Sequence, residues 1–288
     1  WLTIFNVSIQ TSDIAKLALI MYIARLLSKK QDQIKDLRSS FVPIMIPVLL
    51  TVGLILPANF STAALLFATV LVLLFIGRIN MKYIFAMLGV GILMLTILVA
   101  VSQYKLGVLP RIETWKARVE RFIDGESSEG DFQANQAKIA IARGGVLGVA
   151  PGNSLQKDFL PHPYSDFIYA IIIEEYGFIG GFVILFMYLI LFYRVVRIAT
   201  RSPGTYGAFL SVGLGFMLVF QALTNMAVTV NLLPVTGQPL PLVSMGGSSM
   251  WFTSLAIGIV LSVSREIEPE PENEEELETK NSIAAKEE

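Results

Sequence analysis

The chain has 288 residues, of which 54% are hydrophobic and 16% are charged. Soluble domains carry about 25% charged residues, so this composition indicates a membrane protein rather than a soluble globular domain. With no cysteine and one histidine, the chain excludes a disulfide framework, a thiol nucleophile and a metal site built from several histidines.

The net charge of −1 hides an uneven distribution of charge. Residues 265–288 contain ten glutamates and three basic residues, which leaves 19 basic and 13 acidic residues elsewhere, a net charge of +6. Low hydrophobicity and Pro-Glu repeats predict that residues 265–288 form a disordered acidic tail. The tail is either simply solvated or docks a cytoplasmic partner, and we expect no nucleic-acid partner.

The chain starts at Trp1, and the pattern of a signal peptide does not precede the first hydrophobic run. We therefore expect these residues to be a fragment that lacks an N-terminal part.

Seven apolar stretches approach the length of a bilayer-spanning helix, about 17–25 residues. The first is the weakest because Asp13, Lys16 and Arg25 interrupt it. The predicted fold class is an all-α polytopic membrane helix bundle with seven transmembrane helices. In chain order, the stretches are 11–28, 41–57, 61–77, 83–103, 167–193, 206–230 and 248–264.

The basic residues of the short loops predict the orientation. The loops after the first, third and fifth stretches carry nine lysines and arginines, whereas residues 58–60 and 231–247 carry no charge. The basic loops and the C-terminal tail are therefore predicted to be cytoplasmic. Loop 104–166 is then extracytoplasmic, and it is long enough to escape the positive-inside rule.

Loop 104–166 is too long for a passive connection. Residues 110–123 have the pattern of a basic amphipathic helix, which either anchors the loop in the membrane interface or attracts an anionic lipid headgroup. A second predicted helix, 132–143, begins after Asp131, which can cap it. Residues 144–154 resemble a phosphate-binding loop only in glycine content, and they lack its Gly-Lys-Ser/Thr ending. Their glycines instead allow the backbone to pass close to a ligand or to a neighbouring helix.

Asp166 ends this loop, at the start of the fifth stretch. Its position alone fits a residue that satisfies the free N–H groups of a helix start. The nearby His162, between two prolines, is predicted to be an exposed turn residue. Lys157 either pairs with a phosphate or faces water.

Ionisable residues also occur inside the apolar stretches. Asp13 and Lys16 are three residues apart and can pair on one helical face, either to lock helix packing or to serve the function. Glu174 and Glu175 are predicted to be intramembrane and to bond with polar groups of neighbouring helices. Eight residues of helix separate Glu174 from Asp166, about 12 Å, which is too far for a carboxylate pair of the glycosidase kind.

Four stretches of the chain carry a resemblance to known proteins: Gln10-Thr-Ser-Asp-Ile-Ala-Lys16, Phe132 to Gly148, Asp166-Phe-Ile-Tyr-Ala with Glu174-Glu-x-Gly177-x-x-Gly180, and Leu233 to Ser249. They resemble the SEDS family (shape, elongation, division and sporulation) of membrane peptidoglycan polymerases, which includes FtsW and RodA. The match spans residues 1–264, and its last two stretches are long and specific.

Two positions depart from the family pattern. Pro57-Ala58-Asn59 stands where Gln-Pro-Asp is common, and Asp13 stands where Glu is usual. The amino-acid sequence of these stretches is more similar to that of the division-type members of Bacteroidota than to that of the elongation type. Family members have ten transmembrane helices, so the resemblance implies that three are missing before residue 1.

The resemblance implies polymerisation of lipid II, the undecaprenyl-pyrophosphate-linked disaccharide peptide, outside the cytoplasmic membrane during cell division. It implies Asp166 as the catalytic general base. Cations must stabilise the departing pyrophosphate; no cofactor is required, and a divalent cation is possible. The expected substrate-binding residues are Lys16, Asp13, Gln133, Gln136, Arg143, Asn153, Ser154, Lys157, Ser244, Gly246, Gly247, Ser248 and Ser249.

The resemblance further implies a class B penicillin-binding protein (a transpeptidase) and other division proteins as partners. The expected location is the bacterial inner membrane at the division septum. Two other functions stay open: a flippase that moves lipid II across the membrane, and a non-catalytic division scaffold.

Overall fold

The computed structural model describes residues 2–4, 7–34, 36–103, 114–115, 117–119, 122, 132–161 and 163–267. A short antiparallel hairpin, β1 (Leu2–Ile4) and β2 (Val7–Ile9), comes first and was not predicted. The rest confirms the all-α fold class. The helices are α1 (Thr11–Lys29), α2 (Val42–Ile55), α3 (Phe60–Ile76), α4 (Met81–Gln103), α6 (Phe132–Gly144), α7 (Ile168–Arg201), α8 (Thr205–Thr229) and α9 (Gly247–Arg265), with short turns η1 (Gln31–Gln33), η2 (Leu37–Phe41) and η4 (Gln156–Asp158).

Each of the seven apolar stretches forms a helix. Among the described helices, α7, α8 and α9 are long and apolar enough to cross a membrane, while α2, α3 and Met81–Ile97 of α4 are shorter apolar helices. The count of seven spans therefore stays a prediction. α7 continues to Arg201, beyond the predicted end at residue 193, and it bends at Gly177.

α8 is the central helix of the bundle and packs against α1, α3, α7 and α9. Small residues allow this close packing. A Cβ at Gly213 would collide with Ile20 of α1, and one at Gly215 would collide with Val195 of α7. The surrounding core is apolar, so α8 fixes the relative positions of the helices that later form the site.

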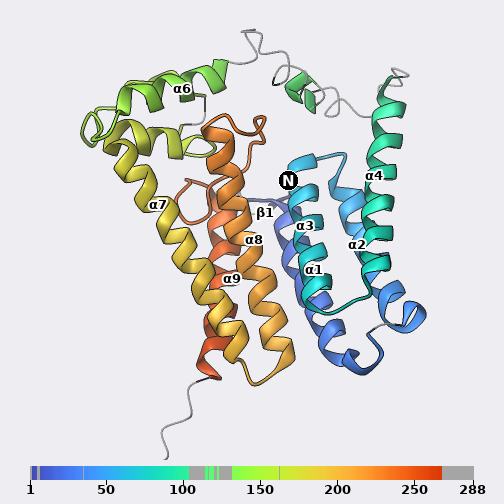
Figure 1. The fold of residues 1–288 in the computed structure, drawn as a ribbon. Helices are drawn as coiled ribbons and strands as arrows, with labels where there is room; N and C mark the ends of the chain where they lie inside the picture. Colours follow the sequence, from blue (N-terminus) through green and yellow to red (C-terminus); the bar gives the residue numbers. More distant parts are fainter. Residues whose placement is uncertain are drawn as a thin grey trace, which may run out of the picture.

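α6 covers the start of α7 at one end of the bundle (Figure 1). Ala137 and Ala140 of α6 pack against Leu160, Phe167 and Ala170. The described chain leaves α9 at the other end (Figure 1). The long loop and the end of α9 thus lie at opposite ends of the bundle.

The predicted helix 110–123 lies largely outside the described residues. Within it, Thr114, Trp115, residues 117–119 and Phe122 are helical, and the ring of Trp115 lies 4.2 Å from that of Phe60 at the start of α3. Asp131, His162 and the tail beyond Ile267 lie outside the described residues.

Candidate functional site

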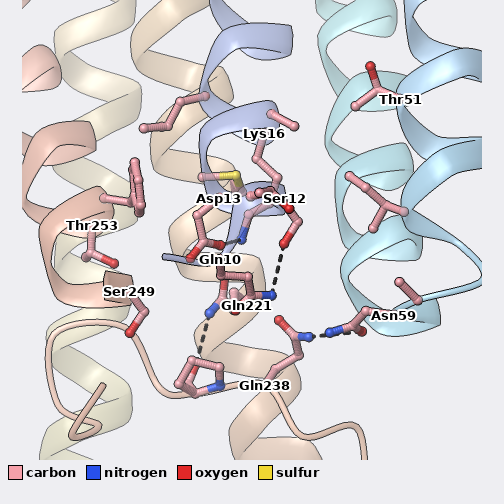
Figure 2. A pocket seen from close by; sticks show the side chains of 18 of the residues that line it. Gln10, Ser12, Asp13, Lys16, Thr51, Asn59, Gln221, Gln238, Ser249 and Thr253 are labelled. Atoms are coloured by element: carbon pink, nitrogen blue, oxygen red, sulfur yellow. Dashed lines mark hydrogen bonds and ion pairs between the residues drawn. The ribbon is translucent and has the colours of Figure 1, made fainter. Parts of the chain in front are cut away.

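A cavity of about 530 Å³ lies between α1, α2, α8 and α9. Its wall is completed by the turn before α3 and by residues 237–239, which belong to the uncharged connection between α8 and α9. Figure 2 shows the polar side chains that face it. They are Gln10, Ser12, Asp13, Lys16, Thr51, Asn59, Gln221, Gln238, Ser249 and Thr253.

The predicted pair of Asp13 and Lys16 is confirmed. Lys16 Nζ lies 2.7 Å from Asp13 Oδ1, and the two side chains are about nine-tenths buried. The second carboxylate oxygen of Asp13 is buried and has no hydrogen-bond partner in the described part of the chain. The pair lines the cavity, so a polar ligand there would meet a compensated ion pair rather than a single charge.

Side-chain amides hold residues 237–239 in place. Gln221 Nε2 of α8 donates to the carbonyl of Pro239 at 3.0 Å. Gln238 Nε2 donates to the hydroxyl of Thr62 at 2.9 Å and reaches Asn59 Oδ1 at 3.4 Å. The cavity wall is thus tied to both α8 and α3 by neutral hydrogen bonds.

Asp166 lies beside this wall. A Cβ built on Gly237 would be 3.6 Å from Asp166 Oδ2. Asp166 Oδ1 accepts a hydrogen bond from the Ser165 hydroxyl at 3.0 Å, and the residue is half-buried. In the described residues no backbone N–H of α7 donates to this carboxylate, although α7 begins only two residues later. The carboxylate therefore does not act as a helix cap, and Oδ2 is free to accept a proton or a hydrogen bond.

Asn225 of α8 positions Asp166 relative to the wall. Its side-chain Nδ2 donates to the backbone carbonyl of Asp166 at 2.8 Å and to that of Gln238 at 2.7 Å. Ser244 adds a second link, because its buried hydroxyl donates to the carbonyl of Ser165. These bonds bring the end of the long loop and the α8–α9 connection together at the cavity edge.

A second polar cluster surrounds Glu174, whose side chain is completely buried. Its carboxylate accepts from Arg143 Nη1 at 2.9 Å, from the Ser154 hydroxyl, and from the backbone N–H groups of Leu155 and Gln156. The predicted bonding of Glu174 to a neighbouring helix is confirmed, since Arg143 belongs to α6. This carboxylate therefore folds the segment after α6 onto the start of α7.

Glycines allow that segment to cross the bend of α7. Gly148 and Gly177 have φ values of +82° and +69°, which L side chains rarely adopt. A Cβ at either glycine would collide with the backbone of the opposite segment. Backbone hydrogen bonds join the segments, from Val149 N to Glu174 O and from Phe178 N to Gly145 O. Of the two roles considered for these glycines, the structure thus supports close approach to a neighbouring helix.

Two of the predicted substrate-binding hydroxyls are engaged within the protein. Ser154 is buried with its hydroxyl on Glu174, and Ser244 is buried between Ser165 and the N–H of Leu240. Both hydroxyls are consumed within the protein. Arg143, also expected to bind substrate, is in an ion pair with Glu174.

The other predicted residues divide between the two clusters. Ser249 lines the cavity, Ser248 is buried, and Gly246 and Gly247 form the start of α9. Lys157 Nζ donates to the carbonyl of Gly152 at 2.8 Å, and the amide of Asn153 donates to that of Val149 at 3.2 Å. Gln133 and Gln136 are half-buried on α6, and Glu175 is half-buried on α7.

The sequence reasoning missed the amides that build the cavity wall. Gln221 and Asn225 are the two side-chain amides of α8 and lie four residues apart, so they share one face, and this spacing was an available signal. Gln10 and Gln238 fell within stretches used for the resemblance but were not predicted as site residues. Arg118 is a further candidate, because its guanidinium donates to the carbonyl of Val235 at 3.1 Å, two residues before Gly237.

Comparison with known proteins identifies the family. Residues 1–268 match the model of the FtsW/RodA/SpoVE family, described as cell cycle proteins. The chain belongs to this family. Stage V sporulation protein E of Bacillus subtilis is 35% identical over 270 residues, which cover 92% of this chain and 71% of that protein. A probable peptidoglycan glycosyltransferase FtsW of Trichlorobacter lovleyi is 36% identical over 268 residues, covering 92% and 68%.

Solved structures of the FtsW/RodA/SpoVE family share the fold. A chain from the structure described as "Structural coordination of polymerization and crosslinking by a peptidoglycan synthase complex" aligns with a TM-score of 0.70 at 25% identity, over 93% of this chain and 73% of that one. The rod shape determining protein RodA of Thermus thermophilus aligns with a TM-score of 0.62 at 24% identity, over 94% and 70%. The chain is therefore a multi-pass membrane protein with the fold of this family.

Proposed function

We propose that this chain is the membrane core of a peptidoglycan glycosyltransferase that polymerises lipid II, with Asp166 as the general base. One observation carries the proposal: the Asp166 carboxylate stands beside a polar cavity, at the end of the bundle that bears the long loop, and one of its oxygens has no partner among the described residues. The names of the FtsW relatives support the reaction class.

The chemistry requires a base and a means of stabilising the leaving group. An acceptor sugar hydroxyl forms a bond to the anomeric carbon of the donor, and the bond from that carbon to pyrophosphate breaks. The hydroxyl proton passes to Asp166, and the electron pair of the broken bond leaves on the lipid pyrophosphate. Because the leaving group is already lipid-linked, the reaction needs no nucleotide sugar.

The negative charge that develops on the departing pyrophosphate requires a cation. Lys16 and Arg143 are both engaged in ion pairs. The Arg118 guanidinium lies beside the site wall, where it donates a hydrogen bond to the carbonyl of Val235. We propose Arg118 and Lys157 as the groups that meet the pyrophosphate charge. The described residues gather no group of three or more His, Cys, Asp or Glu side chains.

The proposal extends to location and partners. We expect the loop end of the bundle to be extracytoplasmic, the C-terminus to be cytoplasmic, and the protein to act at the septum of the inner membrane. We also expect it to work beside a class B penicillin-binding protein, which cross-links the new strand. The synthase-complex relative supports such a pairing of polymerisation with crosslinking.

The decisive test is polymerisation of labelled lipid II by the full-length protein in vesicles, with and without the transpeptidase. Wild-type protein should make glycan chains, and Asp166→Asn should lose at least about 100-fold in rate, the scale of general-base catalysis. Asp158→Asn is the matched control, because Asp158 is an exposed carboxylate of the same loop.

The two other functions predict different results. A flippase would make no chains from lipid II already facing the site, and a scaffold would support division with Asn at position 166. Normal polymerisation by Asp166→Asn would remove the proposed mechanism.

A further inference from the structure

A second cavity of about 520 Å³ lies between α7, α8 and α9, toward the end of the bundle opposite α6 (Figure 1). It shares no lining residue with the candidate site except Leu218 of α8. Three arginines border it, and most of the remaining lining is aliphatic. The arginines are Arg194, Arg197 and Arg201, and the aliphatic residues are Leu191, Val195, Ile198, Leu218, Ile257, Val260, Leu261 and Ile267.

The spacing of the α7 residues separates charge from hydrocarbon. At about 100° per residue, Arg194, Arg197 and Arg201 fall within an arc of about 60°. Leu191, Ile198 and Val195 occupy the adjoining arc. One side of the helix therefore carries a basic stripe directly beside an apolar stripe, and both border the same cavity.

The three arginines have no acidic partner among the described residues. Each is exposed, and within the ranges that the structure describes none of the three guanidinium groups makes an ion pair. Three positive charges thus stand at the mouth of an apolar hollow. A ligand that satisfies both features must combine an anionic group with a hydrocarbon chain.

We propose that this cavity binds an anionic phospholipid of the adjacent leaflet. Its phosphate lies on Arg194, Arg197 and Arg201, and one acyl chain enters between α7 and α9. The acidic tail after Ile267 is the competing occupant, but residues 268–288 contain only two large apolar side chains, Leu277 and Ile283, to fill an aliphatic cavity. A phospholipid matches both the charge and the lining. The proposal stands independently of the glycosyltransferase function.

The test measures lipids that remain bound to the delipidated full-length protein after incubation with vesicles of equal phosphatidylglycerol and phosphatidylcholine, counted by native mass spectrometry. Wild-type protein should retain phosphatidylglycerol in preference to phosphatidylcholine. The triple variant Arg194→Gln/Arg197→Gln/Arg201→Gln should retain at least about fivefold less phosphatidylglycerol, the factor that a single basic group near a membrane surface contributes.

Two further variants make the result specific. The triple control Arg25→Gln/Lys29→Gln/Lys82→Gln removes the same charge from exposed residues that do not line the cavity, and it should retain the lipid. Leu261→Trp fills the cavity while all three arginines remain, and it should reduce bound phosphatidylglycerol.

Three results would overturn the proposal. The first is equal retention of the two lipids by wild-type protein, and the second is an equal loss in the two triple variants. The third is binding that appears only after residues 268–288 are deleted, which would assign the arginines to the tail.

Discussion

The side-chain amide of Asn225 donates a hydrogen bond to the backbone carbonyl of Asp166, 59 residues earlier in the chain. The same amide nitrogen also donates to the carbonyl of Gln238, which belongs to the cavity wall. A single neutral side chain on α8 therefore sets the distance between the proposed base and the wall that it faces.

Replacing Asn225 by Ala should slow polymerisation more than it weakens substrate binding. Two carbonyls would lose their donor, at a cost of about 1–3 kcal/mol in stability, and Asp166 would lose its fixed position. We expect kcat to fall on the order of 100-fold with KM little changed, because small displacements of a catalytic group carry costs of this size.

Thr229→Val is the matched control for Asn225→Ala. Thr229 is buried on the same helix and donates only to the carbonyl of Asn225 within that helix. Kinetics and melting temperatures of both variants check the prediction. Equal activity of the two would show that Asn225 does not position the base.

Replacing Glu174 by Ala should release the segment after α6. The change leaves the Arg143 guanidinium, the Ser154 hydroxyl and two backbone N–H groups without their acceptor. Loss of one partner of a buried ion pair costs about 3–5 kcal/mol. Limited proteolysis should therefore cut residues 144–158 much faster, while Glu175→Ala, which removes the neighbouring half-buried carboxylate, should leave the cutting rate within about twofold of wild type.

Replacing Gly177 by Ala should lower stability by at least about 2 kcal/mol. An L residue at φ +69° is strained, and its Cβ would meet the carbonyl of Val146. Gly148→Ala should lower stability by a similar amount, because Gly148 lies on the segment that crosses α7 at Gly177. Gly247→Ala is the control, since its Cβ would meet no atom within 4 Å. Denaturant unfolding in detergent measures the stability of all three variants. A small loss of stability in Gly177→Ala would contradict the close crossing of the two segments.

A double-variant cycle can decide whether the Asp13–Lys16 pair contacts substrate or only locks helix packing. Lys16→Met and Asp13→Leu should each destabilise by about 3–5 kcal/mol, because each leaves one buried charge alone. The double variant should regain most of that stability, since an apolar pair of similar volume avoids desolvated charges. If the pair contacts substrate, polymerisation stays low in the stable double variant; if it only locks helix packing, activity returns with stability.

Local geometry explains which parts of the site were predictable. The spacing of Asp13 and Lys16 predicts their ion pair, because three residues of helix fix the distance between the side chains. The length of loop 104–166 likewise indicates that function lies there. The bond of Arg143 to Glu174 was not predictable, since it joins residues 31 apart whose distance depends on how α6 folds back on α7.

Tertiary packing also decides features of a helix that the hydrophobic periodicity of its sequence does not reveal. Residues 167–193 have the composition of one straight span, yet α7 bends at Gly177 because another backbone segment crosses it there. Gln221 and Asn225 are polar residues on a largely apolar helix. Their roles depend on the backbone carbonyls of residues 166 and 237–239, which lie outside this helix. A single sequence does not reveal which carbonyls those amides meet.

The connection between α8 and α9 has a practical consequence for measuring this protein. Residues 231–247 carry no charged side chain, and amides and hydroxyls hold the connection through Gln221, Asn225, Gln238 and Ser244. Bonds between neutral groups do not titrate and are barely screened by salt. This side of the cavity should therefore keep its shape across buffers that protonate carboxylates. A change of activity in such buffers would then not reflect a loosening of the wall beside Asp166.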